Sequence, residues 1–357
     1  MAKGTIYDSE RAIFRDARSG LRIFRLTHGP CIATNLYFEM CSFTSDDRYV
    51  VFRSQRFAGR GAPFDLFRAR TDGLELVQLT ERDDLSGIAF CSKKHCAFYV
   101  SEGKVFCLDI LSWEETVIAE APHPSPAYAG SLGAVDQEGR FFFSNCLTPD
   151  GDAVLYRVDV ANSTTKTIFQ WKSQNHIHCD PTGAVVSFNR IDAEGSIPYL
   201  VNSDGTDPRP WHFHKFAHCT WFGTTGKMQG TLVPPGDAIV VVGEHDPAPQ
   251  YLARGRYYWH SSASLDAQWI VSDTNWPEEG LFLVHCPTGN IGYVCETKSS
   301  CSHPQWTHPH PSVSPCMRYV LFNSDMTGVG QVYLAELTDE FLEKIQQGYE
   351  CKPVLWA

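Results

Sequence analysis

The sequence lacks several features that would place it in a common class of protein. Its 357 residues contain no apolar run long enough to span a membrane, and no apolar stretch follows the first methionine as in a secretory signal. The formal net charge of −11 leaves no excess of lysine and arginine to replace the counterions of a nucleic acid. We therefore expect neither a membrane nor a nucleic acid as a partner.

Motifs of several enzyme classes are also absent. There is no G-x-S-x-G nucleophile elbow of a serine hydrolase and no phosphate-binding G-x-x-x-x-G-K-[ST] loop. No C-x-x-C pair occurs among the 13 cysteines, which are odd in number and scattered through strand-like runs. We expect reduced thiols in a cytoplasmic protein, the alternative being a secreted protein with disulfides.

What the sequence does contain is a repeat. A unit of about forty residues recurs seven times, with apolar runs of period-two alternation, and Asp-Gly or Thr-Gly turns separate these runs in several of the copies. The first copy starts at residues 40–44, and the others start near residues 86, 132, 176, 218, 261 and 309. Four short strands in such a unit are typical of a propeller blade. The sequence predicts an all-β, seven-bladed β-propeller that forms a single domain over residues 1–357.

The two ends of the chain predict how the ring closes. Residues 21–27 match the last strand of a unit but have no unit before them, and the seventh unit, which ends near Leu337, lacks this strand. We expect the N-terminal strand to complete the last blade, because closure protects strand edges. Residues 338–347 predict a short helix that Thr338 caps and Gly348 ends.

Histidines recur at the blade spacing. His176, His218 and His260 are 42 residues apart, and His308 follows 48 residues later. The first strand of each blade lines the channel of a propeller, so equivalent positions converge at one mouth. The first three units lack a matching histidine, and neutral imidazoles bind Mn²⁺, Fe²⁺, Ni²⁺ or Zn²⁺. The pattern predicts a divalent metal site, with structural histidines at strand starts as the alternative.

The sharpest local motif is Q-W-T-H-P-H-P-S at residues 305–312. His308 and His310 share a face because side chains alternate along a strand, and Gln305 offers a neutral oxygen ligand. A purely structural His-Pro turn is the alternative.

Two stretches of the chain resemble a known family. The motif at 305–315, followed by Y-V-L-F-N-S-D at 319–325, is similar to the signature of the oligogalacturonate lyases, polysaccharide lyase family 22. The stretch N-L-Y-F at 35–38, with residues 42–44 and 49–52, resembles the opening of that family. The resemblance extends over nearly the whole chain. It implies a seven-bladed propeller that binds Mn²⁺ through three histidines and a glutamine.

The resemblance assigns roles to individual residues. It implies that His260, Gln305, His308 and His310 are the metal ligands. It places His218 at the family's proposed catalytic histidine and His176 at a further active-site histidine.

The implied reaction is β-elimination at a 4-linked uronate. The metal would stabilise charge that develops at the C6 carboxylate, and His218 would remove the C5 proton. Arg190 is the third expected catalytic residue, as a clamp on a substrate carboxylate, although a surface ion pair is the alternative. His176 and His178 would orient the substrate or act as the acid, and we expect one of the two to be structural only. His178, Arg53 and Arg56 are the expected substrate-binding residues, with a solvated loop as the alternative for the arginines.

The sequence also departs from the family. Phe188–Ile191 stands where we expect Cys-His-Glu-Gly, and the third unit is shorter than usual near residues 145–152. A non-catalytic carbohydrate-binding propeller and a metal enzyme acting on another sugar acid are therefore alternatives. The identity of the metal, the uronate, its chain length and the oligomeric state stay open.

Overall fold

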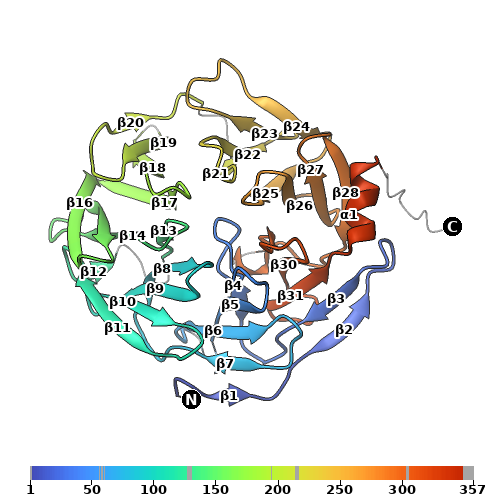
Figure 1. Cartoon of the computed structure of the whole chain (residues 1–357), viewed down its shortest axis with the longest axis horizontal. Coiled ribbons are helices and arrows are strands. Elements are labelled where there is room, and N and C mark those ends of the chain that lie inside the picture. Colours follow the sequence, from blue (N-terminus) through green and yellow to red (C-terminus); the bar gives the residue numbers. More distant parts are fainter. Residues whose placement is uncertain are drawn as a thin grey trace.

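The fold is a ring of seven antiparallel sheets, seen in a computed structural model (Figure 1). The structure describes residues 2–348 except 56, 58, 60, 127–130, 194, 214–216 and 303–304, and the side chain of Trp306. The predicted all-β, seven-bladed propeller is confirmed. Each sheet has four or five strands, and successive blades follow one another around the ring.

The first four blades are built from eighteen of the strands. Blade 1 contains β4 (Ala33–Asn35), β5 (Tyr49–Ser54), β6 (Asp65–Arg70), β7 (Leu76–Gln78) and β1 (Ile6–Tyr7); blade 2 contains β8 (Ser86–Cys91), β9 (Cys96–Ser101), β10 (Lys104–Asp109) and β11 (Glu115–Glu120); blade 3 contains β12 (Ser125–Pro126), β13 (Ala134–Val135), β14 (Phe141–Leu147), β15 (Ala153–Asp159) and β16 (Thr164–Trp171); blade 4 contains β17 (Ser173–Cys179), β18 (Val185–Asp192), β19 (Gly195–Asn202) and β20 (Arg209–Pro210). β2 and β3 also precede blade 1 in the chain, but they belong to blade 7.

The last three blades complete the ring. Blade 5 contains β21 (Ala217–Trp221), β22 (Met228–Leu232), β23 (Ala238–Val242) and β24 (Gln250–Arg254); blade 6 contains β25 (Tyr258–Ala263), β26 (Trp269–Thr274), β27 (Leu281–His285) and β28 (Asn290–Cys295); blade 7 contains β29 (Ser312–Val313), β30 (Tyr319–Ser324), β31 (Gln331–Glu336), β3 (Arg22–Arg25) and β2 (Ala12–Arg15). The 3₁₀ turn η1 (Gln305–Thr307) and the helix α1 (Asp339–Gln346) lie outside the sheets.

The N-terminal segment closes the ring, as predicted. β3 pairs antiparallel with β31, with Ile23 opposite Ala335, and β2 extends the same sheet. The preceding strand, β1, pairs with β7 at the outer edge of blade 1. One segment of chain therefore ties the first blade to the last, and side-chain packing holds it because Ile23 is buried in the core between blades 6 and 7.

The inner strands are irregular where the histidines lie. The pairing register shifts inside β8, β17, β21 and β25, which marks β-bulges. Gly87, His176 and His218 occupy these bulges with positive φ values of 57°, 51° and 50°. A bulge re-aims a side chain that regular alternation would place on a sheet face, so these irregularities set where the imidazoles point.

The inner strand of blade 1 is interrupted more strongly. Asn35 pairs with Phe52 and Phe43 bridges to Val50, so residues 36–42 are looped out of the sheet opposite Val51. We call residues 36–42 the channel loop, and Figure 1 shows this blue segment beside β4 reaching toward the centre of the ring. The predicted start of the first unit, at residues 40–44, is thus only the second half of its inner strand.

The helix α1 lies at the predicted place and covers blades 6 and 7. The Thr338 hydroxyl accepts a hydrogen bond from the Phe341 N–H, as expected of an N-cap. Phe341 and Ile345 are buried in the core cluster shared with β3, β27 and β30. Among the described residues, no helix has the length and apolarity needed to cross a membrane. The described cysteines are free thiols, most of them buried or half-buried.

Ring closure by β3 leads to a stability prediction. Replacing Ile23, which is 1% exposed, with alanine removes buried methyl and methylene groups, and we expect it to lower the free energy of unfolding by about 2–5 kcal/mol. The matched control is Ile13→Ala on the neighbouring strand β2, because Ile13 is 47% exposed and its loss should change stability by less than about 0.5 kcal/mol. Urea denaturation of both variants measures the difference. Equal midpoints for the two variants would contradict the role of β3 in closing the ring.

Candidate metal centre and active site

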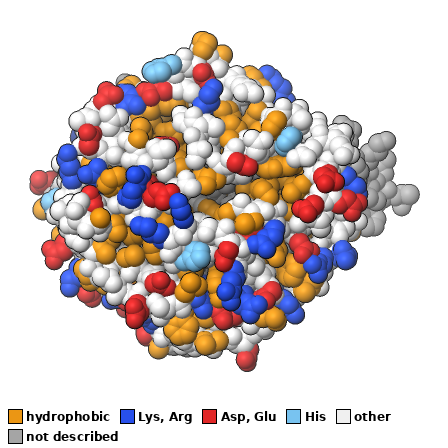
Figure 2. All heavy atoms as spheres, viewed as in Figure 1, with side chains coloured by type: hydrophobic (Ala, Val, Ile, Leu, Met, Phe, Trp, Pro, Cys, Tyr) orange, Lys and Arg blue, Asp and Glu red, His pale blue; other side chains and the backbone are white. Residues whose placement is uncertain are grey.

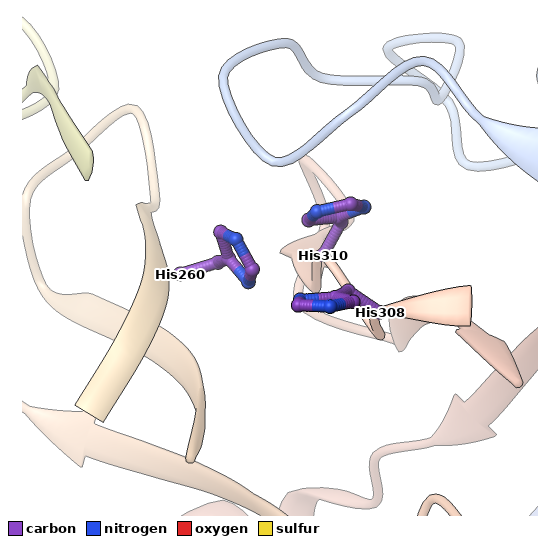
Figure 3. Close-up of side chains that lie close together, drawn as sticks. All are labelled: His260, His308 and His310. Atoms are coloured by element: carbon purple, nitrogen blue, oxygen red, sulfur yellow. The ribbon is translucent and has the colours of Figure 1, made fainter. Parts of the chain in front are cut away.

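Three histidines from two neighbouring blades meet near the axis of the ring. His260 lies in β25, while His308 and His310 lie in the segment between η1 and β29. All three are buried, and their nearest nitrogen atoms lie within 4.8 Å of one another. Figure 3 shows the three imidazoles turned toward a shared space, with the N-terminal ribbon passing beside them. The structure thus brings together the three histidines that we expect from the sequence to be metal ligands.

The chemistry of this trio fits a divalent cation. Nε2 of His260 and Nε2 of His310 are buried without a hydrogen-bond partner in the described part of the chain. Burial, followed by the neighbouring imidazoles, holds the pKa of His260 and of His310 well below the ordinary value, so both rings are neutral. A buried nitrogen without a hydrogen-bond partner costs folding free energy, and a bound metal ion would offset that cost. The neutral form of imidazole is the one that binds metal. His260 and His310 therefore have the protonation state and the open lone pairs of metal ligands, and His308 lies beside them.

Asp273 of β26 orients His260, and sequence reasoning missed it. Its carboxylate accepts hydrogen bonds from the His260 backbone N–H at 2.6 Å and from Nδ1 at 2.8 Å. This contact places the proton on Nδ1 and leaves the Nε2 lone pair facing the other histidines. Burial raises the pKa of Asp273 to about 7, against the opposing effect of the His260 N–H. No motif in the sequence marks this residue.

Two buried asparagines brace the segment that carries His308 and His310. The Asn35 side chain donates to the His310 carbonyl at 2.7 Å, and the Asn323 side chain donates to the His308 carbonyl at 3.3 Å. The Asn323 amide oxygen accepts from the Asn35 N–H at 2.9 Å, which links β4 to β30. Both asparagines belong to the stretches on which the family resemblance depends. Their role here is to fix the backbone of the histidine segment against blade 1.

His218 of β21 lies directly against the trio. Its ring centroid is 4.5 Å from that of His260 and 4.3 Å from that of Trp259. Burial lowers the pKa of His218 to about 4, so the ring is neutral and able to accept a proton. Its Nδ1 is buried and has no hydrogen-bond partner among the described residues.

A second cluster forms across the channel from blade 1 to blade 4. Oε1 of Glu39, in the channel loop, lies 2.5 Å from His176 Nδ1 and 3.5 Å from His178 Nε2. The Glu39 and His178 side chains are 7% and 6% exposed, whereas that of His176 is 38% exposed. Sequence reasoning predicted both histidines as active-site residues but did not predict Glu39. The only signal for Glu39 is its position directly after N-L-Y-F.

The three arginines that the sequence predicts as substrate-binding or catalytic residues differ in the contacts that they make. Arg190 of β18 donates to Asp192 at 3.0 Å and to the Tyr199 hydroxyl at 2.8 Å, and its guanidinium lies 4.5 Å from the Trp171 ring centroid. Local partners therefore already hold this side chain. Arg53 of β5 is close enough to His310 to contribute to the lowering of its pKa. Arg56 lies outside the described residues.

Gln305 begins η1 and has an exposed side chain. Its carbonyl accepts a hydrogen bond from the His308 N–H at 2.9 Å, which fixes the turn ahead of the two histidines. Its service as a fourth metal ligand stays a prediction.

A cavity of about 500 Å³ occupies the end of the channel toward which the inner strands run, away from the histidine trio. All seven blades contribute to its lining, which is largely apolar. Glu39 and His178 reach this cavity from the channel side. Figure 2 shows a central hollow in one face of the molecule with hydrophobic side chains around it. Residues 38–41 of the channel loop line this cavity, whereas the three candidate metal ligands are not among the described residues that line it.

The contact between Asp273 and His260 leads to a prediction. We expect Asp273→Asn to weaken Mn²⁺ binding by about 10–100-fold, because the ring loses the acceptor that fixes its tautomer and orientation. Titration of metal-free protein, followed by the electron paramagnetic resonance signal of free Mn²⁺, measures the affinity. Asp266→Asn, in the exposed β25–β26 turn of the same blade, is the control and should bind as the unaltered protein does. Equal affinities for both variants would show that Asp273 does not support the site.

Comparisons with known proteins agree with the resemblance. No family model matches the chain. Among curated proteins, an oligogalacturonide lyase of Pectobacterium atrosepticum and an oligogalacturonate lyase of Dickeya dadantii are each 23% identical over 394 residues, covering 95% of this chain and 99% of theirs.

Solved structures resemble the chain over the same span. An oligogalacturonate lyase in complex with manganese superposes with a TM-score of 0.81 at 21% identity, covering 96% of this chain and all of the other. The oligogalacturonate lyase of Vibrio parahaemolyticus gives a TM-score of 0.79 at 20% identity, with 95% of this chain covered. Over nearly its whole length, the chain is thus similar in sequence to oligogalacturonate lyases and shares their propeller fold.

Proposed function

We propose that this protein is a Mn²⁺-dependent lyase that cleaves 4-linked uronate oligosaccharides, of the oligogalacturonate type, by β-elimination. The observation that carries the proposal is the buried trio His260, His308 and His310, in which burial keeps His260 and His310 neutral, with His218 packed against it. The names of the relatives and the manganese complex among the similar structures support the same activity. The free thiols of the described cysteines support a cytoplasmic location.

The trio would hold the ion, with Gln305 as the proposed fourth ligand. When bound, a divalent cation supplies Lewis acidity that stabilises negative charge on the uronate carboxylate and so acidifies the C5 proton. Asp273 keeps Nε2 of His260 directed at this position, and the asparagine pair keeps the His308 and His310 backbone in place. Other first-row divalent ions suit the same imidazole set.

His218 is the proposed base. It takes the C5 proton, the electron pair of that bond forms the C4–C5 double bond, and the bond between C4 and the leaving oxygen breaks. Burial keeps His218 neutral before the substrate arrives. A bound uronate is an anion, and its charge raises the proton affinity of a nearby imidazole.

The remaining predicted residues would bind the sugar. We propose that Arg53 and Arg190 bind substrate carboxylates and that His178 lines the site, while Arg56 keeps its predicted role without structural support. The hydroxyl of Tyr199 and the carboxylate of Asp192 accept hydrogen bonds from Arg190, so Arg190 is a rigid donor if it contacts substrate. His176 is proposed to act beside His218.

The role of His218 is tested by replacing it. We expect His218→Ala to lower kcat on trigalacturonate by about 10²–10⁴-fold, with Mn²⁺ affinity unchanged, because the base is lost and the metal ligands are kept. Ultraviolet absorbance of the unsaturated uronate product measures the rate. His212→Ala, at an exposed histidine between β20 of blade 4 and β21 of blade 5, is the control and should keep full activity. Full activity in His218→Ala would refute the assignment of the base, and a Mn²⁺-loaded protein that releases no unsaturated product would refute the proposed function.

A further inference from the structure

The channel loop is an insertion in the inner strand of blade 1 that leads directly to the catalytic candidates. Strand pairing stops at Asn35 and resumes at Phe43, and the Val51 N–H bonds to the Ser42 carbonyl at the point of return. Asn35 is held by the buried contacts to Asn323 and His310. The two ends of the loop are therefore fixed, and the residues between them enter the channel with a defined course.

Aromatic residues of this loop pack on the candidate imidazoles. The Tyr37 ring centroid is 4.3 Å from that of His310 and 6.3 Å from that of His176. The Phe38 ring centroid is 5.1 Å from that of His260 and 5.8 Å from that of His218. The loop thus sets the spacing between the metal trio, the proposed base and His176.

Glu39 extends this loop across the channel to blade 4. A carboxylate that is 7% exposed is stable only when it is paired, and its partner is His176 Nδ1 at 2.5 Å. Burial would raise the pKa of Glu39, but His178 and His176 together lower it below its ordinary value. In turn, Glu39 raises the pKa of His176 despite the burial of the ring. Both shifts favour an ion pair in which Glu39 is ionised and the His176 imidazole carries the proton.

This contact fixes the working nitrogen of His176. Because Nδ1 bonds to the buried carboxylate, Nε2–H is the donor that remains for a substrate. The His176 ring is the exposed member of the cluster, at 38%, so it is accessible where Glu39 is not. The titratable groups that face it are Glu39, His178 and Tyr37, with His218 and His260 at longer range.

We propose that Glu39 is a positioning residue for the lyase reaction, which holds His176 so that its Nε2–H protonates the departing O4. The inference rests on the proposed function. As His218 accepts the C5 proton, the C5–H electron pair forms the double bond, the C4–O bond breaks, and O4 takes the Nε2 proton. His176 ends neutral and His218 ends protonated, and exchange with water restores both. A base on blade 5 and an acid on blade 4 thus complete the elimination.

Glu39, His176 and His178 also have the spacing of a metal-binding group. The direct bond at 2.5 Å to His176, with 3.5 Å to His178, favours a hydrogen-bonded pair over three ligands arranged around an ion. Metal counting separates the two interpretations.

The test compares two uronate substrates that differ only in the leaving group at C4, a sugar or a nitrophenolate. A nitrophenolate departs without protonation, so we expect Glu39→Gln to lower kcat about 10²-fold on the sugar substrate and less than about 3-fold on the nitrophenolate. KM and Mn²⁺ affinity should stay unchanged, and Glu39→Asp should recover part of the loss. The alkaline limb of the kcat profile should move to lower pH in Glu39→Gln, because the carboxylate that raises the pKa of His176 is gone.

Controls keep the test decisive. His176→Ala should show the same dependence on the leaving group, and His218→Ala should lose activity on both substrates. Equal losses in Glu39→Gln on both substrates, or unchanged activity, would overturn the proposal. A second Mn²⁺ per chain that disappears in Glu39→Gln would also overturn it, in favour of a metal site. Inactivity of the unaltered protein on both substrates would instead refute the proposed function.

Discussion

Burial keeps the imidazoles of His260 and His310 uncharged, and the candidate site depends on this. In water about half of such rings would carry a proton near pH 6.5, and charged rings this close would repel one another. Enclosure between blades 6 and 7 instead leaves Nε2 of His260 and Nε2 of His310 without a hydrogen-bond partner among the residues that the structure describes. The fold maintains this costly arrangement through Asp273 and the asparagine pair, which bond to the ring and backbone of the histidines. A cation is the partner that offsets the cost.

Unusual backbone conformations help to position the histidines at the channel. His176, His218 and His310 all have positive φ values, between 45° and 51°, a conformation that non-glycine residues adopt rarely. The same bulge in blade 2 holds Gly87, where no imidazole is needed. Blade 1 takes the irregularity further, since its inner strand opens into the channel loop. Two of these departures from regular pairing, the bulge at His218 and the channel loop, therefore place side chains beside the metal trio.

The fold can be predicted from the sequence because each propeller blade repeats the same local pattern of strands and turns along the chain. The blade period, the unmatched strand at residues 21–27 and the capped helix follow from local patterns, and each has its counterpart in the structure. The histidine spacing predicts which imidazoles share the axis for the same reason. Asp273 and Glu39 could not be predicted as site residues. The contact of Asp273 depends on the bulge in β25, and that of Glu39 depends on the looped-out segment of blade 1. No pattern of hydrophobic residues encodes either irregularity. Arg190 looks like a free clamp in the sequence, whereas the structure gives it local partners in Asp192 and Tyr199.

The most direct measurement is anomalous X-ray scattering from crystals grown with Mn²⁺. We expect one strong manganese peak about 2 Å from a nitrogen of each of His260, His308 and His310, on the side of His260 that faces away from Asp273. A peak elsewhere, or no peak while the ion is present in excess, would contradict it.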